Sequence, residues 1–305
     1  METPFVYDRY VTAKNFIGRK KECGVLANLL EAGEHVVMYE PPKTGKMSLI
    51  QQTLINMRSS GKQFMIVCVD MFNIRTMQEF MIRFGTTVMK AALSTPDQYK
   101  DAIQRHLEGT HFVFDKDRFA IADEVVSMNW EADMNDVEMM FRLPFRIAAE
   151  RDIPYHIILE EFQNIMNDKD YDDALKVMER VFSEQDKSVS FIFTGSRVNA
   201  MKFIFAEKKY FYRQVNRVAL SNVDTKEIIE YVVKGFLSGM GKSFDRNLAM
   251  GACELFKSNL WYINHLAAIC DALSKGFVTE TMMTDALESM ISVHQIRFMS
   301  IVNDL

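Results

Sequence analysis

Residues 40–48 constrain the fold of this chain more than any other segment. They run Glu-Pro-Pro-Lys-Thr-Gly-Lys-Met-Ser and follow directly on the apolar run 35–39. Leucine and isoleucine at helical spacing begin immediately after them. A short strand, a tight loop ending in Gly-Lys and an amphipathic helix together form a phosphate-binding loop, in which unpaired N–H groups and the positive end of the helix dipole face phosphate oxygens.

The loop departs from the full pattern, Gly-x-x-x-x-Gly-Lys-Ser/Thr, at two positions. Glu40 stands at the first glycine, and Met47 stands where a hydroxyl normally binds Mg²⁺. A thioether is a soft, weak ligand, whereas Mg²⁺ prefers hard oxygen ligands. Ser48 carries a hydroxyl, but one further residue turns a side chain by about 100° around a helix. The segment therefore predicts a nucleotide cradle with a weakened metal contact.

A pair of acids follows another apolar run, at 155–159. The two residues after this run are Glu160 and Glu161. In ATPases the first of two such acids holds the hydrated Mg²⁺, and the second polarises the attacking water as a general base. A strand that simply ends in solvated surface acids is the alternative. A phosphate loop after an earlier strand favours the ATPase interpretation.

Composition limits the class of protein. The 305 residues suffice for one large domain or two smaller ones, and 48% hydrophobic with 25% charged residues is typical of a folded globule. A formal net charge of -5 argues against a chain whose main task is to bind nucleic acid. The four cysteines are widely spaced, and no signal-peptide pattern or long apolar run is present. We therefore expect a cytoplasmic protein with no membrane partner.

Five short apolar runs predict the strands of a parallel sheet. Strands buried on both faces are apolar at nearly every position, and these runs are 35–39, 64–70, 155–159, 189–194 and 216–220. Helical patterns alternate with them, and four more helical patterns follow without strands between 224 and 303. We predict an α/β nucleotide-binding domain over residues 1–221 and a smaller all-α lid domain over residues 222–305. The long connection 93–135 is expected to hold helices of its own.

Four motifs in order resemble the prokaryotic AAA+-like ATPases of the STAND group, in particular the archaeal-type ATPase family. Besides the phosphate loop and the acid pair, these are Phe-Ile-Gly-Arg-Lys-Lys-Glu at 16–22 and Phe-Ile-Phe-Thr-Gly-Ser-Arg at 191–197. The resemblance spans residues 14–275. It implies a P-loop NTPase fold of the AAA+/ASCE type, with a five-stranded parallel sheet flanked by helices, a helical lid and the start of a winged-helix region.

The resemblance also implies roles for the matching positions. ATP or ADP would be bound by Ile17, Gly18, Arg19, Pro42, Lys43, Thr44, Gly45, Lys46, Met47, Ser48 and Ser196. Glu160 would take the metal-binding position and Glu161 that of the catalytic base, with Lys46 and Arg197 as further catalytic residues. The segment 258–262 departs from the Gly-x-Pro lid motif of that family, so no lid contact is inferred from it.

These observations predict a nucleotide switch, and a candidate ATPase whose hydrolysis is weak or absent. Met47 and Glu160 alter both ends of one magnesium contact, so a magnesium site would be weakened. The alternative is a non-hydrolysing interaction module with a vestigial nucleotide site. The retained Gly45, Lys46 and Glu161 favour the switch. We also expect an unidentified protein partner and no nucleic-acid binding through this chain alone.

Overall fold

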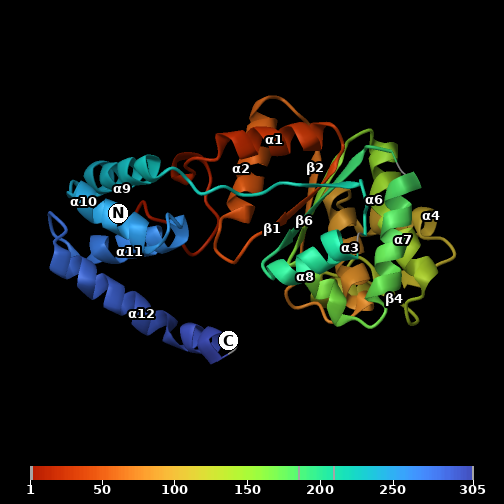
Figure 1. Cartoon of the computed structure of the whole chain (residues 1–305). Helices are drawn as coiled ribbons and strands as arrows, with labels where there is room; N and C mark the ends of the chain where they lie inside the picture. The colour runs from red at the N-terminus through yellow and green to blue at the C-terminus, as the bar shows by residue number, and fades with distance from the viewer. Residues whose placement is uncertain (1–2, 185, 209, 304–305) are drawn as a thin grey trace. The chain divides into compact units, whose positions relative to one another are not determined.

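The computed structural model describes residues 3–184, 186–208 and 210–303, and its chain divides into two compact units (Figure 1). The sheet unit comprises Gly24–Pro42 and Asn56–Ala219. The helical unit comprises Met1–Cys23, Lys43–Ile55 and Leu220–Leu305. The domain boundary at residues 221–222 stays a prediction.

A five-stranded, fully parallel sheet forms the centre of the sheet unit. Its order is β2-β5-β6-β1-β7. The strands are β1 (His35–Tyr39), β2 (Met65–Asp70), β5 (Tyr155–Glu160), β6 (Val189–Gly195) and β7 (Val215–Arg217). The first four agree with the predicted runs. The last one is shorter than the predicted 216–220, because the chain leaves the sheet edge after one further bond from Val218 N–H to Val37 O.

The helices that alternate with the strands lie within a few residues of the helical patterns that the sequence predicts at 19–32, 46–59, 76–92, 136–150 and 171–183. They are α1 (Lys20–Glu31), α2 (Lys46–Ser59), α3 (Met77–Ala92), α6 (Met134–Arg151) and α7 (Tyr171–Glu184). The short helix α8 (Val198–Lys202) and the turns η1 (Ala13–Asn15), η2 (Phe162–Asn167) and η3 (Phe203–Glu207) were not predicted. Local caps explain where several begin: Thr76 and Glu79 form a capping box at the start of α3, and Asp133 and Asp136 form one at α6. Both α1 and α2 run across breaks between the two units.

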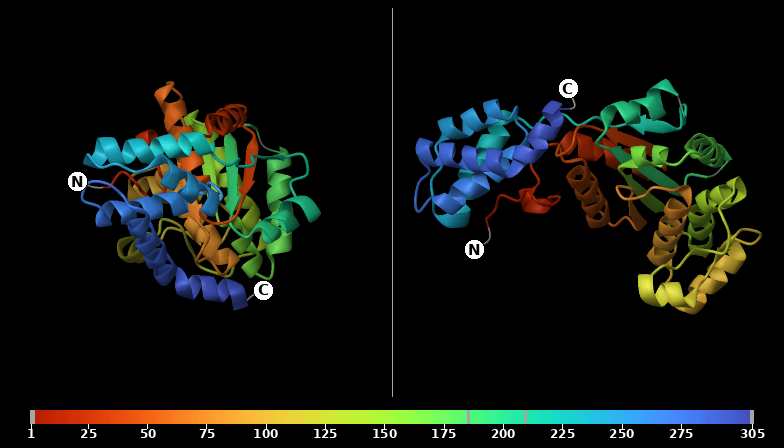
Figure 2. Two further views of the ribbon diagram at one scale, coloured as in Figure 1. Left: turned by 60° about the vertical axis from the view of Figure 1, so that its left-hand side comes forward. Right: turned by 90° about the horizontal axis from the view of Figure 1, so that it is seen from below.

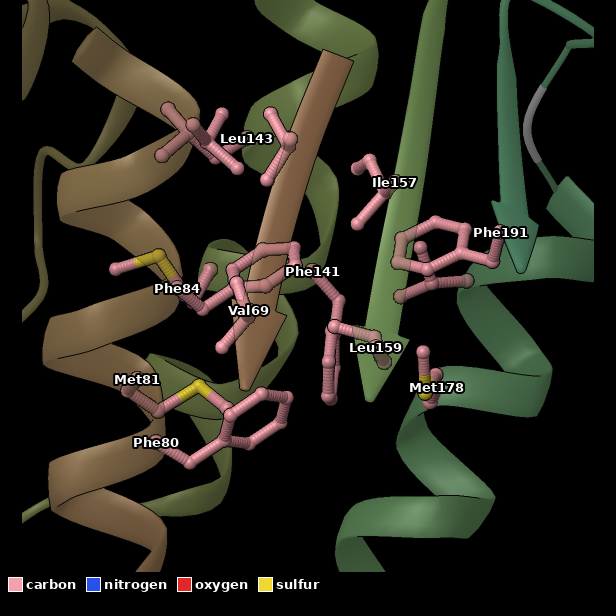
Figure 3. Packing of buried hydrophobic residues seen from close by; sticks show 14 of the residues in the cluster. Val69, Phe80, Met81, Phe84, Phe141, Leu143, Ile157, Leu159, Met178 and Phe191 are labelled. Atoms are coloured by element: carbon pink, nitrogen blue, oxygen red, sulfur yellow. The ribbon is translucent and has the colours of Figure 1, made fainter. Parts of the chain in front are cut away.

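Alternate residues of the strands pack against α3, α6 and α7, which lie on one side of the sheet (Figure 1). Figure 3 shows Val69, Ile157 and Phe191 of three strands facing Phe84 of α3 and Phe141 of α6. All five side chains are fully buried, and the rings of Phe84 and Phe191 stack at 6.3 Å. This apolar layer stabilises the sheet. Because all its strands are parallel, their carboxyl ends lie along one edge, where ligands bind in open α/β folds.

The connection 93–135 holds two helices, as predicted. These are α4 (Pro96–His106) and α5 (Lys116–Ala122). It also holds a two-stranded antiparallel sheet of β3 (Phe112–Val113) and β4 (Ser127–Met128), which the sequence did not indicate. Strands of two residues are too short to show an alternating pattern.

The helical unit contains α9 (Thr225–Met240), α10 (Arg246–Leu255), α11 (Leu260–Leu273) and α12 (Glu280–Asn303). Asp224, Asp245 and Asn259 cap the first three of these helices. The N-terminal segment lies against them (Figure 2), and its Phe5 is fully buried beside Phe236. Among the described residues, no helix is both long and apolar enough to cross a membrane.

Candidate functional site

The phosphate loop has a backbone suited to close approach by an anion. Gly45 has a φ of +86°, and a Cβ at this position would lie only 3.0 Å from Nη1 of Arg19. Lys43 also has a positive φ, +66°, which is strained for a residue with a side chain. Lys46, the first residue of α2, is 9% exposed. The first N–H groups of a helix have no partner within it, so this start of α2 suits phosphate oxygens.

Arg19 donates hydrogen bonds to the backbone of the phosphate loop and to the segment that follows β7. Its Nη1 donates to the carbonyl oxygen of Thr44 at 2.6 Å, and its Nε donates to the carbonyl oxygen of Ser221 at 3.2 Å. Gly18 has a φ of +66°, and a Cβ there would lie 2.7 Å from a methyl group of Val223. Arg19 therefore contacts the loop backbone. The adenine contacts of Ile17, Gly18 and Arg19 stay a prediction.

Ser48 does not offer its hydroxyl oxygen to the loop. Ser48 Oγ accepts a hydrogen bond of 3.1 Å from Val11 N–H, and Gln52 Oε1 accepts one of 2.6 Å from Ala13 N–H. Both bonds tie the first turns of α2 to the N-terminal segment. Met47 has a thioether at the position where the full pattern has a hydroxyl, and the hydroxyl of Ser48 is engaged by the N-terminal segment.

The acid pair lies at the end of β5. Glu160 ends the strand, and Glu161 follows with a φ of +53°, again a strained conformation. Oε2 of Glu161 accepts bonds from Ser196 Oγ at 2.5 Å, Ser196 N–H at 3.2 Å and Gln163 Nε2 at 2.6 Å. Ser196 directly follows β6, the neighbouring strand. The structure thus brings Glu161 and Ser196 together, and adds Gln163, to which the sequence motifs had assigned no role.

Glu160 is held by a residue of the other neighbouring strand. Its Oε1 accepts a hydrogen bond of 3.1 Å from the Cys68 thiol of β2. Burial raises the pKa of Glu160, and the carboxylates of Asp70 and Glu161 raise it further, against the lowering effect of the thiol. The exposed Arg197 begins the turn into α8 after Ser196.

A second group of metal-ligating residues lies beside the β3–β4 pair. Among the described residues, His111, Asp133 and Asp136 bring one ligand atom each within 4.8 Å of one another. Both oxygens of the buried Asp136 already accept bonds of 2.9 Å, from His111 N–H and Nδ1 and from Asp133 N–H. Burial raises the pKa of Asp136, but these hydrogen bonds outweigh it and hold the pKa below its ordinary value. These hydrogen bonds join the His111 segment to the start of α6, so the group has a structural explanation.

No family model and no curated protein matches this sequence. Its fold is similar to that of the Walker-type ATPase of Pyrococcus abyssi, with a TM-score of 0.69 and 14% identity over 99% of this chain and 79% of that one. It is also similar to the ORC2 protein of Aeropyrum pernix in its ADPNP–ADP complexes, with a TM-score of 0.58 and 12% identity over 96% and 73%. For the ORC1 protein of Aeropyrum pernix in complex with DNA, the TM-score is 0.59 with 12% identity over 94% and 68%.

At these identities the likeness establishes the fold alone. The chain has the P-loop fold of AAA+ ATPases, with a five-stranded parallel sheet flanked by helices and an all-α C-terminal region. The predicted fold class is therefore confirmed. The roles of the predicted site residues stay predictions.

Proposed function

We propose that this protein is a STAND-type switch that binds ATP or ADP through its phosphate loop and hydrolyses ATP slowly or not at all. The observation that carries the proposal is the positive φ of Gly45, +86°, directly before Lys46 at the start of α2. Only a residue without a side chain fits this position, and the result is a helix N-terminus open to an anion. The ADPNP–ADP complexes of the Aeropyrum ORC2 protein support an adenine nucleotide as the ligand.

Each remaining residue of the proposed site has one task. Lys46 neutralises phosphate charge at the helix start. In the hydrolysis step, water attacks the terminal phosphate of bound ATP, and ADP and inorganic phosphate are the products. Glu161 polarises that water, and Arg197 stabilises charge on the terminal phosphate. Because Oε2 of Glu161 already accepts three hydrogen bonds, this oxygen has no acceptor position left to orient a water molecule, which supports slow turnover.

The residues present do not fit a standard magnesium site. Met47 offers a thioether, Ser48 Oγ accepts a hydrogen bond from Val11 N–H, and Glu160 Oε1 accepts one from the Cys68 thiol. We therefore infer that the nucleotide is held mainly by its phosphates, and no step of the proposed function depends on the metal. The same observations favour the second candidate function, an interaction module without nucleotide.

Calorimetric titration of ATP and ADP into Lys46→Met separates the two candidates. Methionine is preferable to alanine because Lys46 is 9% exposed and a cavity would perturb the fold. The matched control is Lys62→Met, a surface lysine paired with Glu31 at 2.9 Å. We expect the natural protein and the control to bind alike, and Lys46→Met to bind at least about 100-fold more weakly. Absence of binding to the natural protein would instead establish the interaction module.

A further inference from the structure

Lys43 is a second lysine of the phosphate loop, and it lies over an aromatic ring. Its Nζ is 4.7 Å from the ring centroid of Trp261, inside the range of a cation–π contact. We propose that Trp261 is a positioning residue for the phosphate loop: its ring holds the Lys43 ammonium in the nucleotide-free state, and bound phosphates draw the ammonium away from it. This inference rests on the proposed nucleotide binding. It states that bound nucleotide changes a contact of α11, the helix that contains Trp261.

The backbone of the loop supports this assignment. Lys43 is exposed and has a φ of +66°, a conformation that residues with a side chain rarely adopt. Trp261 is in the first turn of α11, where its backbone N–H donates a hydrogen bond of 3.0 Å to Oδ1 of Asn259, the residue that caps the helix. The contact therefore joins the loop to the capped end of a helix.

The surroundings of Trp261 continue to the N-terminal segment. Its ring meets Tyr7 edge-on at 6.1 Å, and Tyr7 stacks on His265 at 4.1 Å. The Nε1 atom of Trp261 is buried and has no hydrogen-bond partner among the described residues. The ring can therefore shift without breaking a hydrogen bond of its Nε1 atom.

The direction of the effect follows from the two interactions that compete for Lys43. A cation–π contact at an exposed site is weak, whereas a hydrogen bond between an ammonium and a phosphate is charge-assisted and considerably stronger. We therefore expect the Lys43 ammonium to bind phosphates that lie beside Gly45 in preference to the Trp261 ring. Because coupling is reciprocal, the ring must oppose nucleotide binding by as much as the nucleotide weakens the contact.

The first test is a double-mutant cycle on ADP affinity, measured by calorimetry. Trp261→Leu removes the ring face and should bind ADP about two- to fivefold more tightly than the natural protein. Trp261→Phe keeps a ring face and should stay close to the natural affinity. In a Lys43→Met background, Trp261→Leu should have no effect. Unchanged or weaker binding by Trp261→Leu, or the same gain without Lys43, would overturn the inference.

The second test uses the emission of Trp261 and needs no substitution at that residue. Trp130 is 71% exposed and is the other tryptophan of the chain, so Trp130→Phe leaves Trp261 as the reporter. Saturating ADP or inorganic pyrophosphate should change the emission, and adding Lys43→Met should abolish the change at saturation. A constant emission, or a change that persists without Lys43, contradicts the inference. If calorimetry detects no binding to the natural protein, the proposed function itself has failed.

Discussion

The thiol of Cys68 on β2 donates a hydrogen bond of 3.1 Å to Oε1 of Glu160, at the end of the neighbouring strand β5. Loss of solvation around the sulfur and this bond raise the pKa of the thiol, so it remains a protonated donor. Glu160, for which we predict the metal-binding position, thus accepts a hydrogen bond from a cysteine. This pairing makes the dependence on magnesium testable.

Nucleotide affinity should depend only weakly on Mg²⁺. Met47 and the engaged Glu160 leave the phosphates themselves as the main anchor for the metal. Titrations of ATP with Mg²⁺ and with excess chelator should agree within about tenfold, or about 1.4 kcal/mol. A loss above about 100-fold in chelator would show that other residues complete a metal site.

Restoring both ends of the metal contact should increase ATP turnover. Met47→Thr supplies a hydroxyl, and Glu160→Asp shortens the acid and withdraws it from Cys68. We expect steady-state hydrolysis by the double variant to exceed that of the natural protein, with smaller gains for each single change, because residues that share one ligand act as a unit. Adding Glu161→Gln should remove the gain. Rapid turnover by the natural protein would contradict the role given to these two positions.

Gln163→Met should raise turnover without changing ATP affinity. Gln163 is buried, and its Nε2 donates one of the three bonds that occupy Oε2 of Glu161. Loss of this bond leaves an acceptor position on Oε2 for a water molecule and costs about 1 kcal/mol of stability. Single-turnover hydrolysis and calorimetry together measure the two effects. An equal fall in affinity and rate would mean that Gln163 contributes to binding.

The free energy of unfolding should fall as the pH drops from about 6.5 to about 4. Burial lowers the pKa of His35 and of His156 to about 4. His35 Nδ1 accepts a bond of 3.1 Å from Phe191 N–H, which requires the neutral ring. The unfolded chain takes up protons below about 6.5, so each histidine removes up to about 3 kcal/mol over this range.

Urea unfolding at several pH values measures that slope. His35→Gln should flatten it. His111→Gln is the control of opposite sign, since the bond to Asp136 raises the pKa of His111 and stabilises the fold at low pH, a contribution lost as the pH rises through that raised value. It should steepen the loss in acid. Identical slopes for all three proteins would exclude these histidines as the cause.

Local chemistry decided which parts of this molecule the sequence could predict. The bounds of α2, Lys46–Ser59, match the predicted helix because Gly45 and Gly61 flank it and leucines recur along it. β7 was predicted too long because an apolar run at a sheet edge does not need a partner at every residue. The phosphate loop was recognisable because its chemistry requires fixed neighbours in the sequence.

The contacts that set the proposed properties of the site have no local signature. Cys68 and Glu160 are 92 residues apart, and Ser196 follows its partner Glu161 by 35 residues. The contact of Lys43 with Trp261 joins segments separated by most of the chain. Only the packing of the strands and helices brings these residues together.

Phe5 packs into the core of the helical unit. Its ring is fully buried against Phe236, and an added Cβ at Gly235 would lie 2.7 Å from it. A shortened protein beginning near residue 14, where the recognisable motifs begin, would lose this ring at a cost of about 3–5 kcal/mol. It would also lose Tyr7, on which the Trp261 ring rests. A protein shortened to residues 14–275, the span of the recognisable motifs, should therefore express poorly. An affinity tag is better placed at the C-terminus than at the N-terminus.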